Sequence, residues 1–380
     1  SQLLTTVHDL MYNRDKKNQI DVAVLDFAKA FDTVPHRKLL SKLSHYGING
    51  NIHRWISDFL TNRDQSVIID GLASSYVKVA SGVPQGTVLG PLLFLIHIND
   101  LPANVKSQVR LFADDCLLYR VIHSSEDQTT LQEDLNSLEL WGKKWGMKFH
   151  ASKCTILRIA RARKPYSMMY TLCGQVLKET DDAKYLGVLI SKDLDWSQHI
   201  QSVCHKTNTT LSFLRRNLKY CPQKLKEQAY ISLVRSVLEY AATIWDPHES
   251  GDIKLLESVQ RRSARFVMND YKYTSSVSDM LSDLGWITLA DRRKDLRPIL
   301  LYKIIHGVTA VPTDNILVKA DLRTRTGPSH NYKFMHLQPN TSAYKFSYFP
   351  KTIRDWNSMP AAIVECSSLE LFKQQLVLTH

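Results

Sequence analysis

The chain has few cysteines, and its six are scattered over 380 residues. None forms a CxxC pair or a Cys/His ladder, so we expect no zinc ribbon or knuckle, and the free thiols indicate a reducing compartment. The 14 glycines and 13 prolines are too few for collagen or a low-complexity array. The longest apolar run, residues 88–98, is far shorter than the roughly 18–20 residues of a membrane span. The N-terminus does not resemble a signal peptide, so we expect a protein that is neither inserted in a membrane nor secreted.

The composition is that of a basic globular protein. Hydrophobic residues make up 44% of the chain and charged residues 23%, which excludes a wholly disordered chain. The formal net charge of +12 favours a polyanionic partner, nucleic acid first and an anionic membrane surface second. Any one basic cluster reads most simply as a solvated face, but four of them favour phosphate-backbone binding in the second half. They span residues 158–164, 215–219, 260–265 and 292–297.

The order of elements predicts an α+β fold followed by a helical region. We expect strands over 21–27, 65–69, 76–80, 109–112, 116–121, 155–159 and 185–190. We expect helices over 1–14, 35–46, 51–60, 87–101, 125–145, 196–218, 223–245, 252–267, 276–284 and 288–306. A linker is expected around 309–330, and a small aromatic module follows it. These patterns indicate three regions, 1–192, 193–270 and 271–380, and the last has no assigned role.

Two predicted helices carry more specific expectations. In the helix over 51–60, the apolar spacing places Ile52 and Trp55 on the inward face. In the helix over 125–145, Ser125 and Gln128 have the spacing of a capping box.

Three aspartates stand where apolar strands end. Asp26 follows a buried strand, and Asp114 and Asp115 lie at the tip of a predicted hairpin. Burying such acids is costly unless cations compensate them. Adjacent strands could bring Asp26 beside Asp114, and a set of hard oxygen ligands suits Mg²⁺. Seen alone, the Asp114-Asp115 pair is better interpreted as a hairpin turn, because Asp is a common turn residue.

Five motifs, in order, resemble the palm motifs of reverse transcriptases. They are Val24-Leu-Asp-Phe-Ala-Lys-Ala-Phe-Asp32, Ser81-Gly-Val-Pro-Gln-Gly-Thr-Val-Leu-Gly-Pro91 with the segment 94–101, Phe112-Ala-Asp-Asp115, Trp145-Gly-Met-Lys-Phe149 with Ser152-Lys-Cys154, and Tyr185-Leu-Gly-Val188. The amino-acid sequences of these motifs are most similar to those of the enzymes of non-LTR retrotransposons of the jockey and CR1 kind. The resemblance covers roughly residues 1–190. It implies a right-hand polymerase palm, with an antiparallel sheet and packed helices, followed by a mainly helical thumb.

The resemblance implies an RNA-directed DNA polymerase that adds dNTPs to a primer 3′-OH on an RNA template. Asp26, Asp114 and Asp115 would be the catalytic residues and would ligate two Mg²⁺ ions, for which Mn²⁺ could substitute. The partners would be an RNA template, a DNA primer and dNTP.

The resemblance also assigns binding roles by position. Phe27, Phe31, Gln85, Gly86 and Lys153 would bind the dNTP. Of these, Phe31 would be the sugar gate against a 2′-OH and Lys153 would lie near the pyrophosphate. Core packing is the alternative for Phe31, and a solvated loop position is the alternative for Lys153. Tyr185, Leu186 and Gly187 would form the primer grip.

The helical thumb would grip the template–primer duplex through its phosphates. The candidate residues are Arg215, Arg216, Arg261, Arg262 and Arg265. The chain begins 25 residues before Asp26, so we expect it to lack most of the fingers region. Two alternatives therefore stay open, an inactive module that holds RNA or an RNA/DNA hybrid and an inert relic. The life cycle of such elements implies the nucleus or the cytoplasm.

Overall fold

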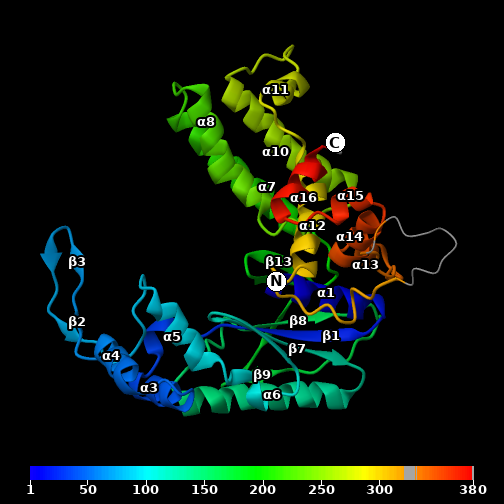
Figure 1. The fold of residues 1–380 in the computed structure, drawn as a ribbon. Helices are drawn as coiled ribbons and strands as arrows, with labels where there is room; N and C mark the ends of the chain where they lie inside the picture. Colours follow the sequence, from blue (N-terminus) through cyan, green and yellow to red (C-terminus); the bar gives the residue numbers. More distant parts are fainter. Residues whose placement is uncertain (321–329, 331, 379–380) are drawn as a thin grey trace. The chain divides into compact units, whose positions relative to one another are not determined.

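The chain folds into two compact units (Figure 1). The computed structural model describes residues 1–320, 330 and 332–378. One unit comprises residues 17–185, and the other joins residues 1–16 to residues 186–380. Helix α1 (Gln2–Asp15) therefore groups with the C-terminal half, where Asp15 accepts hydrogen bonds from the backbone of Asn340 and Thr341. The predicted regions 193–270 and 271–380 lie in one unit, which also contains residues 1–16 of the predicted region 1–192.

A five-stranded sheet forms the centre of the unit 17–185. Its strand order is β11-β8-β1-β7-β6, with β1 (Gln19–Leu25) in the middle. Strand β1 pairs antiparallel with β7 (Asp115–Ile122) and with β8 (Thr155–Ile159). Strand β6 (Gln108–Phe112) forms the hairpin with β7, whereas β11 (Lys178–Thr180) runs parallel to β8. The sheet is thus antiparallel, as predicted, except at the β11 edge.

Helix α6 (Ser125–Trp145) covers one face of this sheet (Figure 1). Its apolar residues share one core with the sheet, because Leu131 and Leu135 pack in the same buried cluster as Ala23 of β1 and Leu118 of β7. The predicted helix bounds are confirmed. The capping residues were wrong by one position, since Ser124 and Asp127 form the capping box.

Gln128 does not cap the helix. Its side chain is buried against the central strand β1. Its side-chain amide donates to Asp21 at 3.0 Å, and Tyr170 donates to the same carboxylate at 2.7 Å. Arg158 also lies 3.4 Å from Asp21 and bonds Glu179, with its own side chain 8% exposed. This residue of the first basic cluster therefore neutralises a buried acid.

Shorter elements complete the unit. They are α2 (Ala30–Thr33), α3 (His36–His45), α4 (Gly50–Leu60), α5 (Leu89–Ile98), η1 (Leu101–Asn104), β9 (Thr171–Leu172), β10 (Gln175–Val176) and β12 (Asp182–Tyr185). In α4, Ile56 and Leu60 are buried, but Ile52 and Trp55 are 64% and 58% exposed. The prediction that these two residues face inward was wrong, because the packed side of α4 is a narrow stripe.

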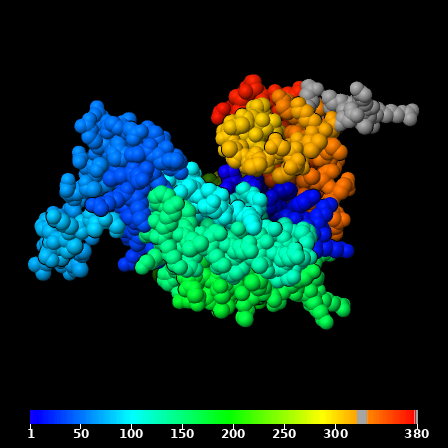
Figure 2. Space-filling view, turned by 90° about the horizontal axis from the view of Figure 1, so that it is seen from below, coloured from blue at the N-terminus to red at the C-terminus, as the bar shows by residue number. Residues whose placement is uncertain are grey.

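A long irregular hairpin follows α4 and projects from the body of its unit (Figure 2). Strand β2 (Asp64–Gln65) pairs with β5 (Val77–Lys78), and β3 (Ile68–Ile69) pairs with β4 (Leu72–Ala73). The chain turns at Asp70-Gly71, where both residues have positive φ.

The second unit is mainly helical. Its elements after α1 are β13 (Val188–Ser191), α7 (Ser197–Asn217), α8 (Gln223–Tyr230), the π-helical turn η2 (Ile231–Arg235), α9 (Ser236–Glu239), α10 (Ser250–Met268), α11 (Val277–Asp283), α12 (Leu289–Ile305), α13 (Ser342–Lys345), α14 (Tyr348–Asn357), α15 (Ala361–Val364) and α16 (Leu369–Val377). The predicted linker around 309–330 lies partly outside the described residues. None of the helices in the described part of the chain is long and apolar enough to cross a membrane.

The helix predicted over 223–245 ends early, at Glu239. Ala241 has a left-handed backbone with φ of 52°, which stops the helix. The buried Trp245 then donates from its indole to the carbonyl of Tyr240 at 2.9 Å. Tertiary packing of this indole thus decides the helix end, which the periodicity of the sequence does not show.

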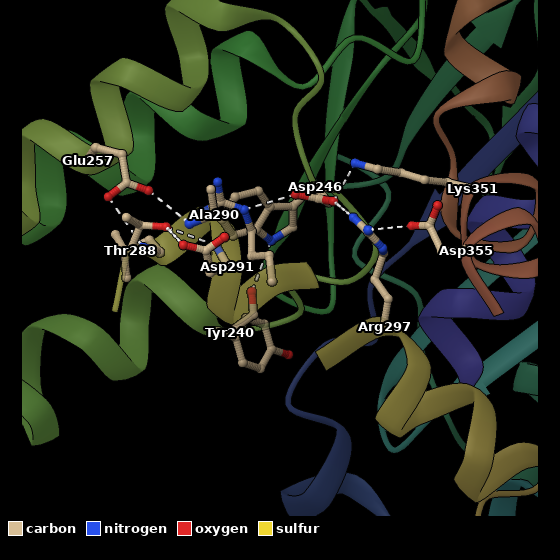
Figure 3. A network of polar contacts seen from close by, with 12 residues as sticks. Tyr240, Asp246, Glu257, Thr288, Ala290, Asp291, Arg297, Lys351 and Asp355 are labelled. Carbon is tan, nitrogen blue, oxygen red and sulfur yellow. Dashed lines mark hydrogen bonds and ion pairs between the residues drawn. The ribbon is translucent and has the colours of Figure 1, made fainter. Parts of the chain in front are cut away.

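A buried ion network lies inside the second unit (Figure 3). Asp246 pairs with Arg293 at 2.9 Å, with Lys351 at 2.6 Å and with Arg297. Arg297 also bonds Asp355 at 2.7 Å. Arg293 and Arg297 of the fourth basic cluster are therefore structural, and the simplest interpretation of that cluster, a solvated face, was wrong for these two residues.

Candidate active site

The pairing of β1 with β7 brings distant aspartates to one end of the sheet. Leu25 lies opposite Cys116 in the antiparallel register, so the next residue, Asp26, comes opposite Asp115. Phe112 pairs with Asp115 in the β6–β7 hairpin, which leaves Ala113 and Asp114 at its tip. Ala113 has a φ of 50°, which permits so tight a reversal. The prediction that adjacent strands carry these acids is confirmed.

The charges of Asp26 and Asp114 act on the carboxylate of Asp115. The pKa of Asp115 is raised, first by partial burial and then by the negative charges of Asp114 and Asp26. Among the described residues, however, no three acidic, histidine or cysteine side chains form a group that could hold a metal ion. The three carboxylates are neighbours, but they do not form the metal-binding group that the sequence predicts, since like charges repel one another.

Lys153 reaches the same place from another segment. Its ammonium lies 3.6 Å from the Asp26 carboxylate, and its side chain is 64% exposed. The backbone fixes this approach, because the N–H of His150 donates to the carbonyl of Asp26 and the N–H of Ala28 donates to that of Lys148, both at 2.8 Å. The fourth motif is thus held against the first, and Lys153 is more than a solvated loop lysine.

The two phenylalanines of the first motif have different surroundings. Phe27 is 3% exposed and stacks on Phe149, with ring centroids 4.4 Å apart. Its side chain is therefore part of the core, and the structure does not support a nucleotide contact by that ring. Phe31 is only partly buried and stacks on Phe94 at 4.4 Å. It packs against the core while keeping part of its ring exposed, so both readings of Phe31 stay compatible with the fold.

The second motif docks on the backbone of α2. The N–H groups of Gly82 and Val83 donate to the carbonyls of Val34 and Phe31, each at 2.8 Å. Gly82 has a φ of 93°, and a Cβ placed there would lie 2.8 Å from the Asp32 carbonyl oxygen. Only glycine allows this close approach. The loop and the Phe31 segment therefore form one rigid element.

Gln85 and Gly86 stand at the open end of this loop, and both are exposed. The Gln85 amide donates to the carboxylate of Asp32 at 2.9 Å. Gly86 has a φ of 77° and nothing within 4 Å of where a Cβ would be. The sequence reasoning gave Asp32 no role, although it closes the first motif six residues after Asp26. The structure shows that its carboxylate orients Gln85.

The predicted primer-grip residues form a turn after β12. Tyr185 ends β12 and is 2% exposed, and Leu186 and Gly187 follow with φ of 46° and 81°. The Tyr240 hydroxyl donates to the Leu186 carbonyl at 2.9 Å. A Cβ at Gly187 would lie 3.2 Å from the Tyr240 ring. The turn is thus shaped by Tyr240, which sequence reasoning did not single out.

The candidate phosphate-binding arginines fall into two groups. Arg215, Arg216, Arg261 and Arg262 are exposed on α7 and α10, and Arg262 donates to the side chain of Asn208 at 3.0 Å. Arg265 instead donates to the carbonyls of Asp270, Lys272 and Ser275 at 3.4, 2.9 and 3.2 Å. It fixes the loop after α10, so the structure does not support a phosphate contact by Arg265.

The donor set fits a divalent cation chemically. Three carboxylates provide hard oxygen atoms, and after partial burial it is the negative charges of Asp114 and Asp26 that raise the pKa of Asp115, a repulsion that a cation would relieve. Asp26, Asp114 and Asp115 are the residues that would hold it.

Comparisons with known proteins agree with this geometry. Residues 2–190 match the family model described as reverse transcriptase (RNA-dependent DNA polymerase). The RNA-directed DNA polymerase from mobile element jockey of Drosophila funebris is 30% identical over 64% of this chain and 28% of its own length. Its namesake from Drosophila melanogaster is 25% identical over 89% of this chain and 38% of its own length. The chain thus spans about a third of the length of these relatives.

A solved structure, apo telomerase from Candida tropicalis, matches 74% of this chain and 46% of that chain, with a TM-score of 0.43 and 11% identity. The family model and the relatives confirm the resemblance that the five motifs carry. The chain belongs to the reverse transcriptase family.

Proposed function

We propose that this chain is an RNA-directed DNA polymerase of a non-LTR retrotransposon. The observation that carries the proposal is the β1–β7 register, whose last pair, Leu25 with Cys116, brings Asp26 and Asp115 to the same end of the sheet, beside the hairpin tip with Asp114. These three residues stand in two motifs of a chain that belongs to the reverse transcriptase family. Enzymes of this family in general use divalent metal ions.

The proposed ion is Mg²⁺, because all three candidate ligands are hard carboxylate oxygens. When bound, it would lower the pKa of an attacking hydroxyl and stabilise the charge of a leaving pyrophosphate. Asp26, Asp114 and Asp115 would hold it. Lys153 lies 3.6 Å from Asp26 and supplies a positive charge that favours binding of a triphosphate at this end of the sheet.

The loop of the second motif supports the nucleotide-binding part of the proposal. Its backbone bonds to Phe31 and Val34 fix its position relative to the partly exposed Phe31 ring. Gln85 is oriented by Asp32 at 2.9 Å, and Gly86 leaves open space beside it. A deoxynucleotide whose C2′ lies against the Phe31 ring would exclude a 2′-OH by steric contact. RNA template and DNA primer are the proposed nucleic-acid partners.

Primer extension on poly(rA)/oligo(dT) tests the proposal. We expect extension with Mg²⁺, and we expect Asp114→Asn to lower it by about a thousandfold or more, because a transition-state charge loses its stabilisation. The matched control is Asp58→Asn, which removes an exposed carboxylate from α4. Binding of the hybrid should be retained in both variants.

The outcomes separate the hypotheses. Hybrid binding by the wild-type chain without any extension would show a module that holds nucleic acid without turnover. Equal extension by wild type and Asp114→Asn would remove Asp114 from the catalytic residues.

A further inference from the structure

A basic hollow lies where the ends of three packed helices meet in the second unit. Helices α7, α8 and α10 run side by side (Figure 1). The hollow has a volume of about 410 Å³ and no acidic side chain lines it. Its charged lining residues are Arg215, Arg216, Lys219 and Lys226, and Phe266, Asn269, Tyr271 and Ser212 complete it. Four cations without a lining carboxylate favour an anionic ligand.

The low exposure of Lys226 is not explained by its contacts within the protein. Its side chain is 4% exposed, yet its ammonium forms no hydrogen bond or ion pair with another described residue. Its one contact of electrostatic kind is with the Phe266 ring, at 5.8 Å. The residue is thus almost entirely covered, yet it lines the hollow with no acidic side chain beside it, so an anion that enters the hollow would meet its positive charge.

The helix dipoles do not account for this lysine. Arg215 and Arg216 lie in the last turn of α7, where the negative helix end favours cations by itself. Lys226, in contrast, is the fourth residue of α8, in the half of the helix where the dipole disfavours a positive charge. An anion in the hollow would favour all of these cations together.

Three exposed tyrosines lie in the two segments that flank the hollow, Tyr220 after α7 and Tyr271 and Tyr273 after α10. Tyr220 is 90% exposed, Tyr271 is 49% exposed and Tyr273 is 101% exposed. Lys219 lies over the Tyr220 ring at 5.2 Å, and Arg215 lies over the Tyr271 ring at 4.7 Å. Aromatic rings among cations provide surfaces on which unpaired bases stack, whereas the bases of a duplex are already stacked on one another.

The loop that carries two of these tyrosines is held in place. Arg265 donates to the carbonyls of Asp270, Lys272 and Ser275, which brackets Tyr271 and Tyr273. The nearest acid in sequence, Asp270, accepts from the Lys272 N–H at 3.0 Å and does not line the hollow. The rings are therefore presented on a fixed loop beside the cations.

We propose that this hollow and its tyrosines bind single-stranded nucleic acid, with a phosphate beside Lys226 and bases stacked on Tyr271 and Tyr273. This binding does not need the carboxylate site, so it can hold or fail independently of the proposed polymerase activity. The shared chemistry of RNA and DNA strands, a phosphate chain with unpaired bases, is what the hollow recognises.

Fluorescence anisotropy with the full chain tests the proposal. The probes are 5′-fluorescein-labelled (U)12, (dT)12 and a 12-base-pair RNA/DNA hybrid. We expect Lys226→Met to weaken binding of at least one single strand about tenfold, because a charge-assisted contact is lost. We expect Tyr271→Leu with Tyr273→Leu to weaken it about fivefold or more. The hybrid should lose less than twofold in both cases.

The matched control is Lys224→Met, which removes an exposed lysine from the same helix outside the hollow. A thermal melt provides a second readout, since Lys226→Met should melt at or above the wild-type temperature without nucleic acid and gain less from (U)12. Arg216→Ala, at an exposed position, replaces Lys226→Met if that variant does not fold. Equal single-strand affinities for Lys226→Met and Lys224→Met would overturn the proposal. Equal losses on the hybrid would also overturn it, because they would show backbone grip of a duplex.

Discussion

Asp115 is exposed at the start of β7 and Asp246 is buried in the second unit, and their surroundings shift the pKa in opposite directions. Burial raises the pKa of Asp115, and the charges of Asp114 and Asp26 raise it further. Burial would also raise the pKa of Asp246, but Lys351, Arg297 and Arg293 outweigh this and lower it. One acid thus lies among like charges, and the other lies among three cations.

The difference separates a structural charge cluster from a functional one. Asp246 and its partners come from distant segments and neutralise one another inside the fold, so they join those segments (Figure 3). Of the three aspartates at the β1–β7 end, Asp26 has Lys153 beside it, so a surplus of negative charge remains, which costs folding stability and suits the binding of a cation. Charge in the sequence does not indicate function until its partners are known.

Substitution of Asp246, the acid that three cations compensate, should have the largest effect on stability. We expect Asp246→Asn to lower the free energy of unfolding by about 3–5 kcal/mol, because three cations are left without their shared partner. The folded pKa of Asp246 lies below its unfolded value near 3.9, so its contribution is present above about pH 4 and is lost as the pH falls further. Urea unfolding at pH 7 and at pH 3 measures both effects.

The matched control for this change is Asp283→Asn, at an exposed position of α11 in the same unit. It should alter the free energy by less than about 0.5 kcal/mol. Similar stabilities for the two variants would show that the ion network contributes nothing net.

Substitution of two glycines in the second motif, in the unit 17–185, should have an intermediate effect on stability. Gly82→Ala and Gly86→Ala each place a side chain at positive φ, at about 1–2 kcal/mol. Only Gly82→Ala also drives a Cβ against the Asp32 backbone, so it should destabilise more and reduce primer extension more. Thermal melts and extension assays on both variants check this. A larger loss for Gly86→Ala would contradict the docking of the loop as described.

The exposed and the structural arginines of α10 should differ in salt dependence. We expect Arg261→Ala with Arg262→Ala to flatten the slope of log affinity against log salt for an RNA/DNA hybrid by up to about two contacts' worth. Arg265→Ala should leave that slope unchanged and lower the melting temperature, because three carbonyls lose their donor. An unchanged slope in the double variant would remove this helix face from duplex binding.

Removing the uncompensated acid should have the smallest effect on stability, and of opposite sign. We expect Asp115→Asn to raise the free energy of unfolding at pH 7 by less than about 1 kcal/mol, because it relieves repulsion at a partly exposed site. The folded pKa of Asp115 is raised, so the cost of its charge is present above that pKa and is relieved as the pH falls through it. The gain should therefore vanish by about pH 3. Urea unfolding beside Asp58→Asn measures it, and a loss of stability at pH 7 would contradict the electrostatic account.

The local elements were largely predictable from periodicity. The helix over 125–145 and the strand over 155–159 have the predicted bounds, because each shows an uninterrupted apolar spacing between clear stop signals. The end of α9 was not predictable, since the Trp245 indole and the left-handed Ala241 decide it. The inward face of α4 was also misassigned, because an apolar residue on an amphipathic helix need not meet a partner.

The residues of the candidate site were predictable from the sequence, but the contacts between them were not. The motifs name Asp26, Asp114 and Asp115, but only the sheet register sets Asp26 opposite Asp115. Asp32 as the partner of Gln85 depends on a loop that docks some fifty residues away along the chain. Side-chain contacts between distant segments leave no periodic signal, so sequence reasoning missed them.

The sequence by itself determined the family, the order of the motifs and most of the helices and strands, because these depend on local patterns and on residue identity. The tertiary structure decided which charges are neutralised and which stay open. Arg265 is a phosphate-contact candidate in the sequence and Arg297 is a member of a basic cluster, yet Arg265 binds the carbonyls of a loop and Arg297 compensates Asp246. Lys226 looks like an ordinary lysine of a polar helix, and its low exposure and its place on the wall of a basic hollow are what distinguish it. The physical reason is that the energy of a charge is set by its neighbours in space.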